Sequence, residues 1–231
     1  MKILLIDTCV DIGTIALADT DLQPAAMATA ALHGRIASER LLPAVRDLAA
    51  SHSLILQSLD AIVVVHGPGS FTGVRVGLSA AKGLCESLNV PLIAISRLAV
   101  LVHIAEFPPN TAVYAVLDAG RGEFYVGAYL GEVCRREAML TRDELLAAIR
   151  REDAPAVVTC EPAVAELLAE LNPRLIAQPT AEFALPLALR RILDQAFDDT
   201  ATIDANYLRR TDAEIFAKQR PKASVAGTLV R

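Results

Sequence analysis

Apolar residues in the first half of the chain alternate between short continuous runs and stripes at helical spacing. Three β-like runs come first, and their close succession predicts an antiparallel meander. Two amphipathic helices follow, and after each comes a continuous apolar run that is typical of a strand buried on both faces. The predicted elements are strands at 3–6, 12–18 and 25–32, a helix that begins at 38 and includes 49, a strand at 61–65, a helix at 70–88 and a strand at 92–95.

The second half repeats this pattern less regularly after turn residues at 108–110. The order of three strands, helix, strand, helix and strand in the first half is that of one half of an actin-like, ribonuclease-H-like fold. We therefore predict an α/β, two-lobed fold with mixed sheets flanked by helices. Its domains are placed at 1–105 and 106–231, with the option that the C-terminal segment packs back on the first lobe. The second-half elements are predicted at 112–118, 123–130, 141–151, 156–159, 162–171, 174–177 and 181–197.

Composition limits the partners and the compartment. The 231 residues are 53% hydrophobic, which is enough for a sizeable core, and the net charge of −5 argues against a chain that grips nucleic acid by itself. The first residues lack the regions of a signal peptide, and the apolar stretch at 98–105 is far shorter than the roughly 20 residues of a membrane span. We expect a cytoplasmic protein without membrane contact.

Its four cysteines lie far apart without a C-x-x-C pair, which predicts free thiols.

The segment 66–78 combines a strand end, a glycine-rich turn and a helix start. The Ser70 side chain can cap the helix, and exposed N–H groups in the first helical turn favour an anion such as a phosphate. The alternative is that Gly67 and Gly69 only form a tight turn, while Gly73 and Gly77 let the helix approach the sheet. The residues alone favour this alternative, because short glycine motifs often occur without a ligand.

The turn after the first strand is a second candidate for phosphate contact. Asp7 is placed to coordinate a magnesium-bound phosphate, although Asp and Thr also favour turns through local hydrogen bonds. We predict that no cofactor is required and keep ATP or ADP binding, as in an actin-like ATPase, as the alternative. The candidate cleft residues are Asp7, Thr8, Gly67, Gly69, Ser70, Thr72 and Arg75.

Several segments carry a family resemblance that covers most of the chain. The run G-P-G-S-F-T-G-V-R at 67–75 resembles the signature of TsaB proteins, and 118–125 resembles the family's D-A-R-R-G-E-V-Y. Cys9 and Val10 depart from the small hydroxyl-rich residues usual in the family's first turn. The other matching segments are Ile6-Asp7-Thr8, Ser38-Glu39-Arg40-Leu41-Leu42-Pro43, Ala80-Ala81-Lys82-Gly83-Leu84 and Tyr207-Leu208-Arg209.

This resemblance implies a protein of the acetate-kinase, sugar-kinase, Hsp70 and actin (ASKHA) superfamily. It implies a non-catalytic accessory subunit of the bacterial machinery that makes threonylcarbamoyladenosine in tRNA. The expected partners are the catalytic paralogue TsaD, in a heterodimer, and the P-loop ATPase TsaE. Without its partner the chain is expected to form a homodimer, and contact with tRNA is expected to be indirect.

The two predicted helices of the first half carry more apolar and small residues than one sheet-facing stripe requires. On pattern alone, packing inside the chain and contact with a partner are equally good explanations. The resemblance favours a partner interface, because members of the family pair through these helices. The predicted interface residues are Leu41, Leu42, Val45, Val74, Gly77, Leu78 and Ala81.

Two kinds of enzyme find little support in the sequence. The catalytic paralogue holds a metal through an H-x-x-x-H pair, and the four histidines at 33, 52, 66 and 103 lack that spacing. We therefore predict no metal site, and the glycoprotease name of the superfamily has no metalloprotease support here. A Ser70–His66–Asp7 hydrolase triad is disfavoured because Ser70 lacks the G-x-S-x-G nucleophile elbow.

Overall fold

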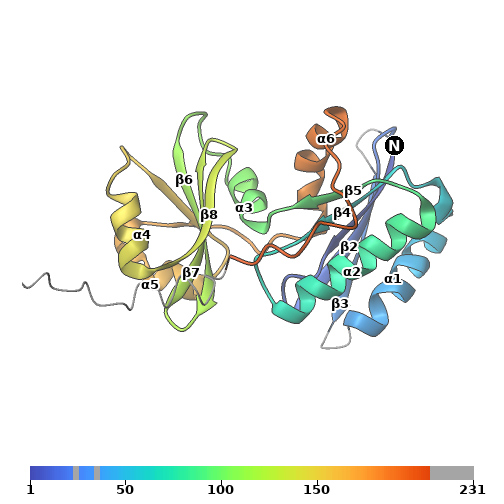
Figure 1. The fold of residues 1–231 in the computed structure, drawn as a ribbon, viewed down its shortest axis with the longest axis horizontal. Helices are drawn as coiled ribbons and strands as arrows, with labels where there is room; N and C mark the ends of the chain where they lie inside the picture. Colours follow the sequence, from blue (N-terminus) through green and yellow to red (C-terminus); the bar gives the residue numbers. More distant parts are fainter. Residues whose placement is uncertain (23–25, 34–36, 209–231) are drawn as a thin grey trace, which may run out of the picture.

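A computed structural model describes residues 1–22, 26–33 and 37–208 and shows two lobes side by side, each built on a five-stranded sheet (Figure 1). In the first sheet the strand order is β3-β2-β1-β4-β5, with β1 antiparallel to β2 and parallel to β4. All five residues of β4 are buried, which explains its continuous apolar sequence. The strands are β1 Lys2–Asp7, β2 Ile12–Asp19, β3 Ala26–His33, β4 Ala61–Val65 and β5 Leu92–Ile95.

Helices cover both faces of this first sheet. Helices α1 (Ala37–Ser51) and α2 (Phe71–Leu88) lie side by side on one face (Figure 1). The 3₁₀ helix η3 (Ala181–Ala184) and helix α6 (Leu185–Leu193) pack against the sheet from the other face. Both of these come from the far end of the chain, so the first lobe is completed by a returning segment.

The second sheet repeats the topology of the first. Its strand order is β10-β9-β6-β7-β8. Strands β6, β7 and β8 form an antiparallel meander, and β9 and β10 extend the sheet in parallel from β6, as β4 and β5 do from β1 in the first lobe. Helix α3 (Arg97–Ala105) covers one face, and α4 (Arg142–Ile149) with α5 (Pro162–Leu167) covers the other. The strands are β6 Ala112–Gly120, β7 Glu123–Leu130, β8 Val133–Thr141, β9 Ala156–Thr159 and β10 Arg174–Leu175; two further 3₁₀ helices are η1 Leu56–Ser58 and η2 Ala169–Leu171.

Side-chain packing crosses the boundary expected at residue 106. Leu98 and Leu101 of α3 lie fully buried in the core of the second lobe, although they precede that boundary. In the opposite direction, Ala184 and Ala188 lie in the core of the first lobe. The two domain ranges stay a prediction, and the two lobes are interlocked by these exchanged segments.

The α/β, actin-like fold class is confirmed, and so are the seven elements predicted for the first half, although Ala25 lies outside the described residues. In the second half, the predicted helix at 181–197 is divided into η3 and α6. Besides the short 3₁₀ helix η1, one helix and one strand were not predicted. Helix α3 is buried on nearly all sides between the lobes and shows no apolar stripe, whereas β8 is an edge strand with few buried residues and shows no alternation.

The cysteines and the helices agree with two other expectations. All four cysteines are free thiols, and only Cys134 is exposed. No helix in the described part of the chain combines the length and the apolar character that a membrane span requires.

Candidate functional site

The turn between β1 and β2 is fixed by hydrogen bonds from the chain itself. The Asp7 carboxylate accepts a 2.8 Å hydrogen bond from the backbone N–H of Cys9. The Cys9 thiol donates to the carbonyl of Val65 at 3.2 Å, and the Cys9 carbonyl accepts from the N–H of Ser70 at 2.8 Å. The turn therefore occupies the space in front of the glycine-rich segment.

Three glycines let the start of α2 touch this turn. A Cβ atom added to Gly73 would overlap the Thr8 carbonyl oxygen, and one added to Gly77 would overlap the Thr8 hydroxyl oxygen. Gly69 stands in the same close contact with the Cys9 carbonyl. The Thr8 hydroxyl donates a 2.7 Å hydrogen bond to the carbonyl of Gly73. Close approach between helix and turn accounts for these glycines, which is the alternative that the sequence favoured.

The start of α2 uses part of its anion-binding capacity internally. Ser70 is the N-cap and accepts a 3.3 Å hydrogen bond from the N–H of Gly73, as predicted. The N–H of Ser70 donates to Cys9, as described above. Thr72 is exposed at the first turn. Phosphate binding at this loop remains a prediction, but the protein's own groups already accept from two of the N–H groups there.

Asp7 and Arg97 are two buried charged residues near the place where the two lobes meet, and no hydrogen bond or ion pair joins them within the described residues. Asp7 is 2% exposed, and desolvation raises the pKa of its carboxyl, against the opposing effects of the Cys9 N–H and the Arg97 charge. Arg97 is 3% exposed and donates to the Gln178 side-chain oxygen at 3.2 Å and to the Cys160 sulfur at 3.6 Å. Within the described residues its Nε has no partner. Polar groups of both lobes thus converge on one buried cation.

The backbone of the glycine segment is attached to both sides of this junction. The Arg97 N–H donates to the Gly67 carbonyl at 2.8 Å, and the Asn206 N–H donates to the His66 carbonyl at 2.8 Å. The Asn206 side-chain amide donates at 2.6 Å to the carboxylate of Glu137 on β8. The segment around Asn206 therefore connects the first lobe to the second.

Arg75 belongs to an aromatic cluster at the surface. Its guanidinium lies 3.8 Å from the centre of the Phe71 ring, and its Nε donates to the Tyr207 hydroxyl. Phe71 itself is 56% exposed. Tyr207 begins the matching C-terminal element, of which Arg209 lies outside the described residues. Among the predicted cleft residues, Asp7, Thr8, Gly67, Gly69 and Ser70 come together at the junction, whereas Arg75 is held at the surface.

The predicted partner interface lies mostly inside the first lobe, and its contact with a partner stays a prediction. Six of its seven residues are buried inside the first lobe, where they hold α1 and α2 to the sheet, because their stripes face inward. A partner cannot contact these side chains without unpacking the helices. Leu42 is the exception at 51% exposure. The six buried residues are Leu41, Val45, Val74, Gly77, Leu78 and Ala81.

The residues considered for catalysis or metal binding do not assemble within the described structure. No hydrogen bond there joins the side chains of Ser70, His66 and Asp7, and His66 Nδ1 lies 3.2 Å from the Asp204 carbonyl instead. His103 pairs with Glu132 at 2.6 Å. Three or more histidine, cysteine or acidic side chains do not gather anywhere in the described residues as a metal ion would require. The side chain of His33 lies outside them.

The sequence identified most of the residues at the interlobe junction, but it did not identify Arg97. Arg97 follows the last strand of the first lobe and precedes a mainly apolar stretch, and no motif in the sequence marks it. Gln178 and Cys160 are distant from it in sequence. The available signal was an arginine at the start of a helix that is otherwise apolar except for His103.

Together the repeated topology and the junction define a two-lobed, actin-like α/β protein whose interlobe site is filled by its own polar groups. A family model described as tRNA N6-adenosine threonylcarbamoyltransferase matches residues 32–151, just over half of the chain. The tRNA threonylcarbamoyladenosine biosynthesis protein TsaB of Haemophilus influenzae is 30% identical over 190 residues, which cover 76% of this chain and 80% of that protein. The chain belongs to the TsaB family.

Two further relatives support this assignment. TsaB of Escherichia coli is 35% identical over 130 residues, 56% of this chain, and the match spans only 55% of that relative's length. The solved structure of YeaZ from Pseudomonas aeruginosa is 28% identical, has a TM-score of 0.71 and aligns with 90% of this chain and 99% of its own. The structural match therefore extends over both lobes.

Proposed function

We propose that this chain acts in threonylcarbamoyladenosine modification of tRNA as a non-catalytic accessory subunit that binds a TsaD-type paralogue. Family membership supports the pathway, because relatives carry that biosynthetic name. The junction supports the accessory role, because Asp7 and Ser70 are committed to hydrogen bonds within the chain. We extend the proposal to a cytoplasmic assembly that includes a TsaE-type ATPase, with tRNA contacted indirectly and a homodimer when the paralogue is absent.

The outward face of α1 and α2 is the observation that carries the partner proposal. Leu42 exposes half of its surface there, in a helix whose other leucines are turned to the sheet. Gly83 is exposed in the interior of α2, and a Cβ atom there would meet nothing within 4 Å. Glycine at such a position costs about 1 kcal/mol relative to alanine, without an internal contact that requires it. A partner backbone that approaches closely gives the position a purpose.

Co-purification with a TsaD-type paralogue tests the proposal. We expect wild-type chain to form a stable heterodimer and Leu42→Asp to weaken it about tenfold or more, because a charge would be buried without a partner. Leu193→Asp is the matched control, since Leu193 is 79% exposed at the end of α6, away from this face. Equal affinity of the two variants would contradict the interface, and lack of any heterodimer would contradict the function.

Nucleotide binding has less support than partner binding. The Asp7 carboxylate is nearly inaccessible, and it already accepts a hydrogen bond from the Cys9 N–H. A magnesium-bound phosphate could reach this carboxylate only if the turn around it opened. Titration of the isolated chain with ATP and magnesium separates this alternative, because saturable binding that Asp7→Ala abolishes would favour it.

A further inference from the structure

A cavity of about 320 Å³ lies in the first lobe at the opposite end of β1 from Asp7. The six residues of β1 place it roughly 17 Å from the interlobe junction. Its volume is at the lower end of the range of about 300–1,000 Å³ for small-molecule sites. A ligand here would therefore be about the size of an amino acid and would not touch the junction.

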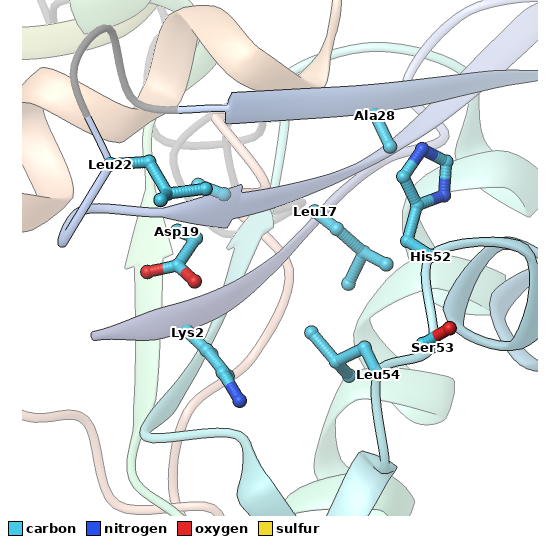
Figure 2. Close-up of a pocket in the computed structure, with 9 residues that line it drawn as sticks. Lys2, Leu17, Asp19, Leu22, Ala28, His52, Ser53 and Leu54 are labelled. Carbon is cyan, nitrogen blue, oxygen red and sulfur yellow. The ribbon is translucent and has the colours of Figure 1, made fainter.

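Sheet residues and the loop after α1 form the walls of this cavity, which are mainly apolar, although His52 and Ser53 of the loop also line it (Figure 2). Leu17 on β2 and Ala28 on β3 are direct cross-strand neighbours, so they project from the same face of the sheet. Leu54, in the loop that follows α1, faces them across the cavity, and Leu22 lies at the edge (Figure 2). Leu22 is 49% exposed, which leaves a way in from solvent. These aliphatic groups would accept an aliphatic side chain.

Two opposite charges lie at one end of the same cavity. Lys2 and Asp19 are directly paired in the β1–β2 register, so both side chains project toward the cavity (Figure 2). Within the described residues, the Lys2 ammonium has no ion-pair partner, and the Asp19 carboxylate accepts only the 3.1 Å hydrogen bond from the Asp21 N–H. The register thus places an available cation beside an available anion.

We infer that this cavity binds a free aliphatic α-amino acid, such as leucine. The ligand carboxylate would accept hydrogen bonds from the Lys2 ammonium, and the ligand ammonium would donate to the Asp19 carboxylate. One tetrahedral carbon carries both ligand charges, which suits two protein charges on adjacent strands. The same carbon directs the ligand side chain to Leu17, Ala28 and Leu54. This site is independent of the partner surface on α1 and α2.

Titration of the full chain with L-leucine, followed by NMR of the leucine methyl groups, tests this site. We expect saturable shifts at Leu17 and Leu54 with a dissociation constant on the order of a millimolar or tighter. The desamino analogue 4-methylpentanoate and the descarboxy analogue 3-methylbutylamine should each bind about tenfold more weakly, because each lacks one charged contact. Glycine should cause no shift, because it has no side chain for the walls.

Single-charge variants connect the binding to the two residues. Asp19→Asn and Lys2→Gln should each weaken leucine binding about tenfold or more. Asp47→Asn is the matched control, because Asp47 is exposed on α1 and lies outside the cavity. Ala28→Leu should fill the cavity and abolish binding. If that variant does not fold, Asp19→Asn and Lys2→Gln still test whether leucine binds at this cavity. Absence of saturation by leucine, equal binding of either analogue, or unchanged binding by Asp19→Asn would overturn the inference.

Discussion

The two lobes share a strand order but fix the turn at the end of their first strand in different ways. In the first lobe the start of α2 packs against the turn after β1. Gly69, Gly73 and Gly77 lie in close contact with Thr8 or Cys9 of that turn. In the second lobe the turn after β6 carries Gly120 and Gly122, and a Cβ atom on either would meet nothing within 4 Å. One topology therefore supports one packed turn and one open turn.

The same residue type serves a different physical purpose in each turn. Gly73 is needed because there is no room for a side chain, whereas Gly122 is needed because its φ of +76° lies in the left-handed region. The packed turn lies at a junction closed by Arg97, and the open turn lies at the surface. A glycine pattern therefore does not distinguish a ligand loop from a packing contact until its neighbours are known.

Loss of the buried arginine should have the largest effect, because it removes the centre of the junction. We expect Arg97→Ala to lower the free energy of unfolding by about 3–5 kcal/mol, since it empties a buried position and leaves the buried Cys160 sulfur and the Gln178 side-chain oxygen without their donor. Urea unfolding monitored by circular dichroism measures the change.

Arg190→Ala is the control for this variant, because it also removes an arginine that joins the lobes. Arg190 of α6 pairs with Glu132 of the second lobe, but its side chain is 60% exposed. We expect a cost of about 1 kcal/mol or less for this exposed pair. Similar losses in the two variants would show that burial of Arg97 does not matter.

Replacing Gly73 or Gly122 by alanine should distinguish a glycine required by close packing from one required by its backbone conformation. We expect Gly73→Ala to destabilise the protein by about 3 kcal/mol, because the new Cβ would overlap the backbone oxygen of Thr8. Gly122→Ala should cost only about 1–2 kcal/mol, since it meets no neighbour and only adopts a less favourable φ. Thermal and urea unfolding of both variants make the comparison.

Gly83→Ala completes the comparison within α2 itself. Gly83 is helical and faces open space, so alanine should stabilise the isolated chain by up to about 1 kcal/mol. Opposite signs for Gly73→Ala and Gly83→Ala would confirm that contact, and not helix propensity, decides the effect. The contrast between the turns fails if Gly122→Ala costs as much as Gly73→Ala.

The sequence predicted the first lobe well because its elements face one core. The strand at 61–65 is buried throughout, and both long helices show an inward stripe. Helix α3, which precedes the boundary expected at residue 106, was missed, because a helix buried on nearly all sides has no polar face to mark its period. Strand β8 was missed because an edge strand with few buried positions does not alternate.

The site was predictable in part, for a similar reason. Asp7, Thr8 and the glycine segment are local features of the sequence, and the structure brings them together. Their partner Arg97 was not predictable, because Gln178 and Cys160 reach it only through the fold. The same limit explains the partner interface. The pattern identified the apolar positions of α1 and α2, but it could not assign Leu42 to the outside and Leu41 to the inside.

The smallest effect should be a change in how stability depends on pH. Burial raises the pKa of the Asp7 carboxyl above its ordinary value of 3.8, although the Cys9 N–H and Arg97 oppose the shift. In the pH range just above 3.8 the unfolded state then releases the Asp7 proton while the folded state keeps it. The unfolded state binds fewer protons there, so Asp7 makes the protein less stable as pH rises through its folded pKa.

Asp7→Asn should remove this contribution, because the amide oxygen still accepts from the Cys9 N–H and does not ionise. We expect the variant to gain stability relative to wild type as pH rises from 3.8, measured by urea unfolding at a series of pH values. Glu161→Gln gives a second case in the other lobe: burial also raises the pKa of the Glu161 carboxyl, so this variant should likewise gain stability relative to wild type as pH rises. If Asp7→Asn instead loses stability relative to wild type as pH rises, the attraction of Arg97 outweighs desolvation, and the junction holds Asp7 as a charged partner.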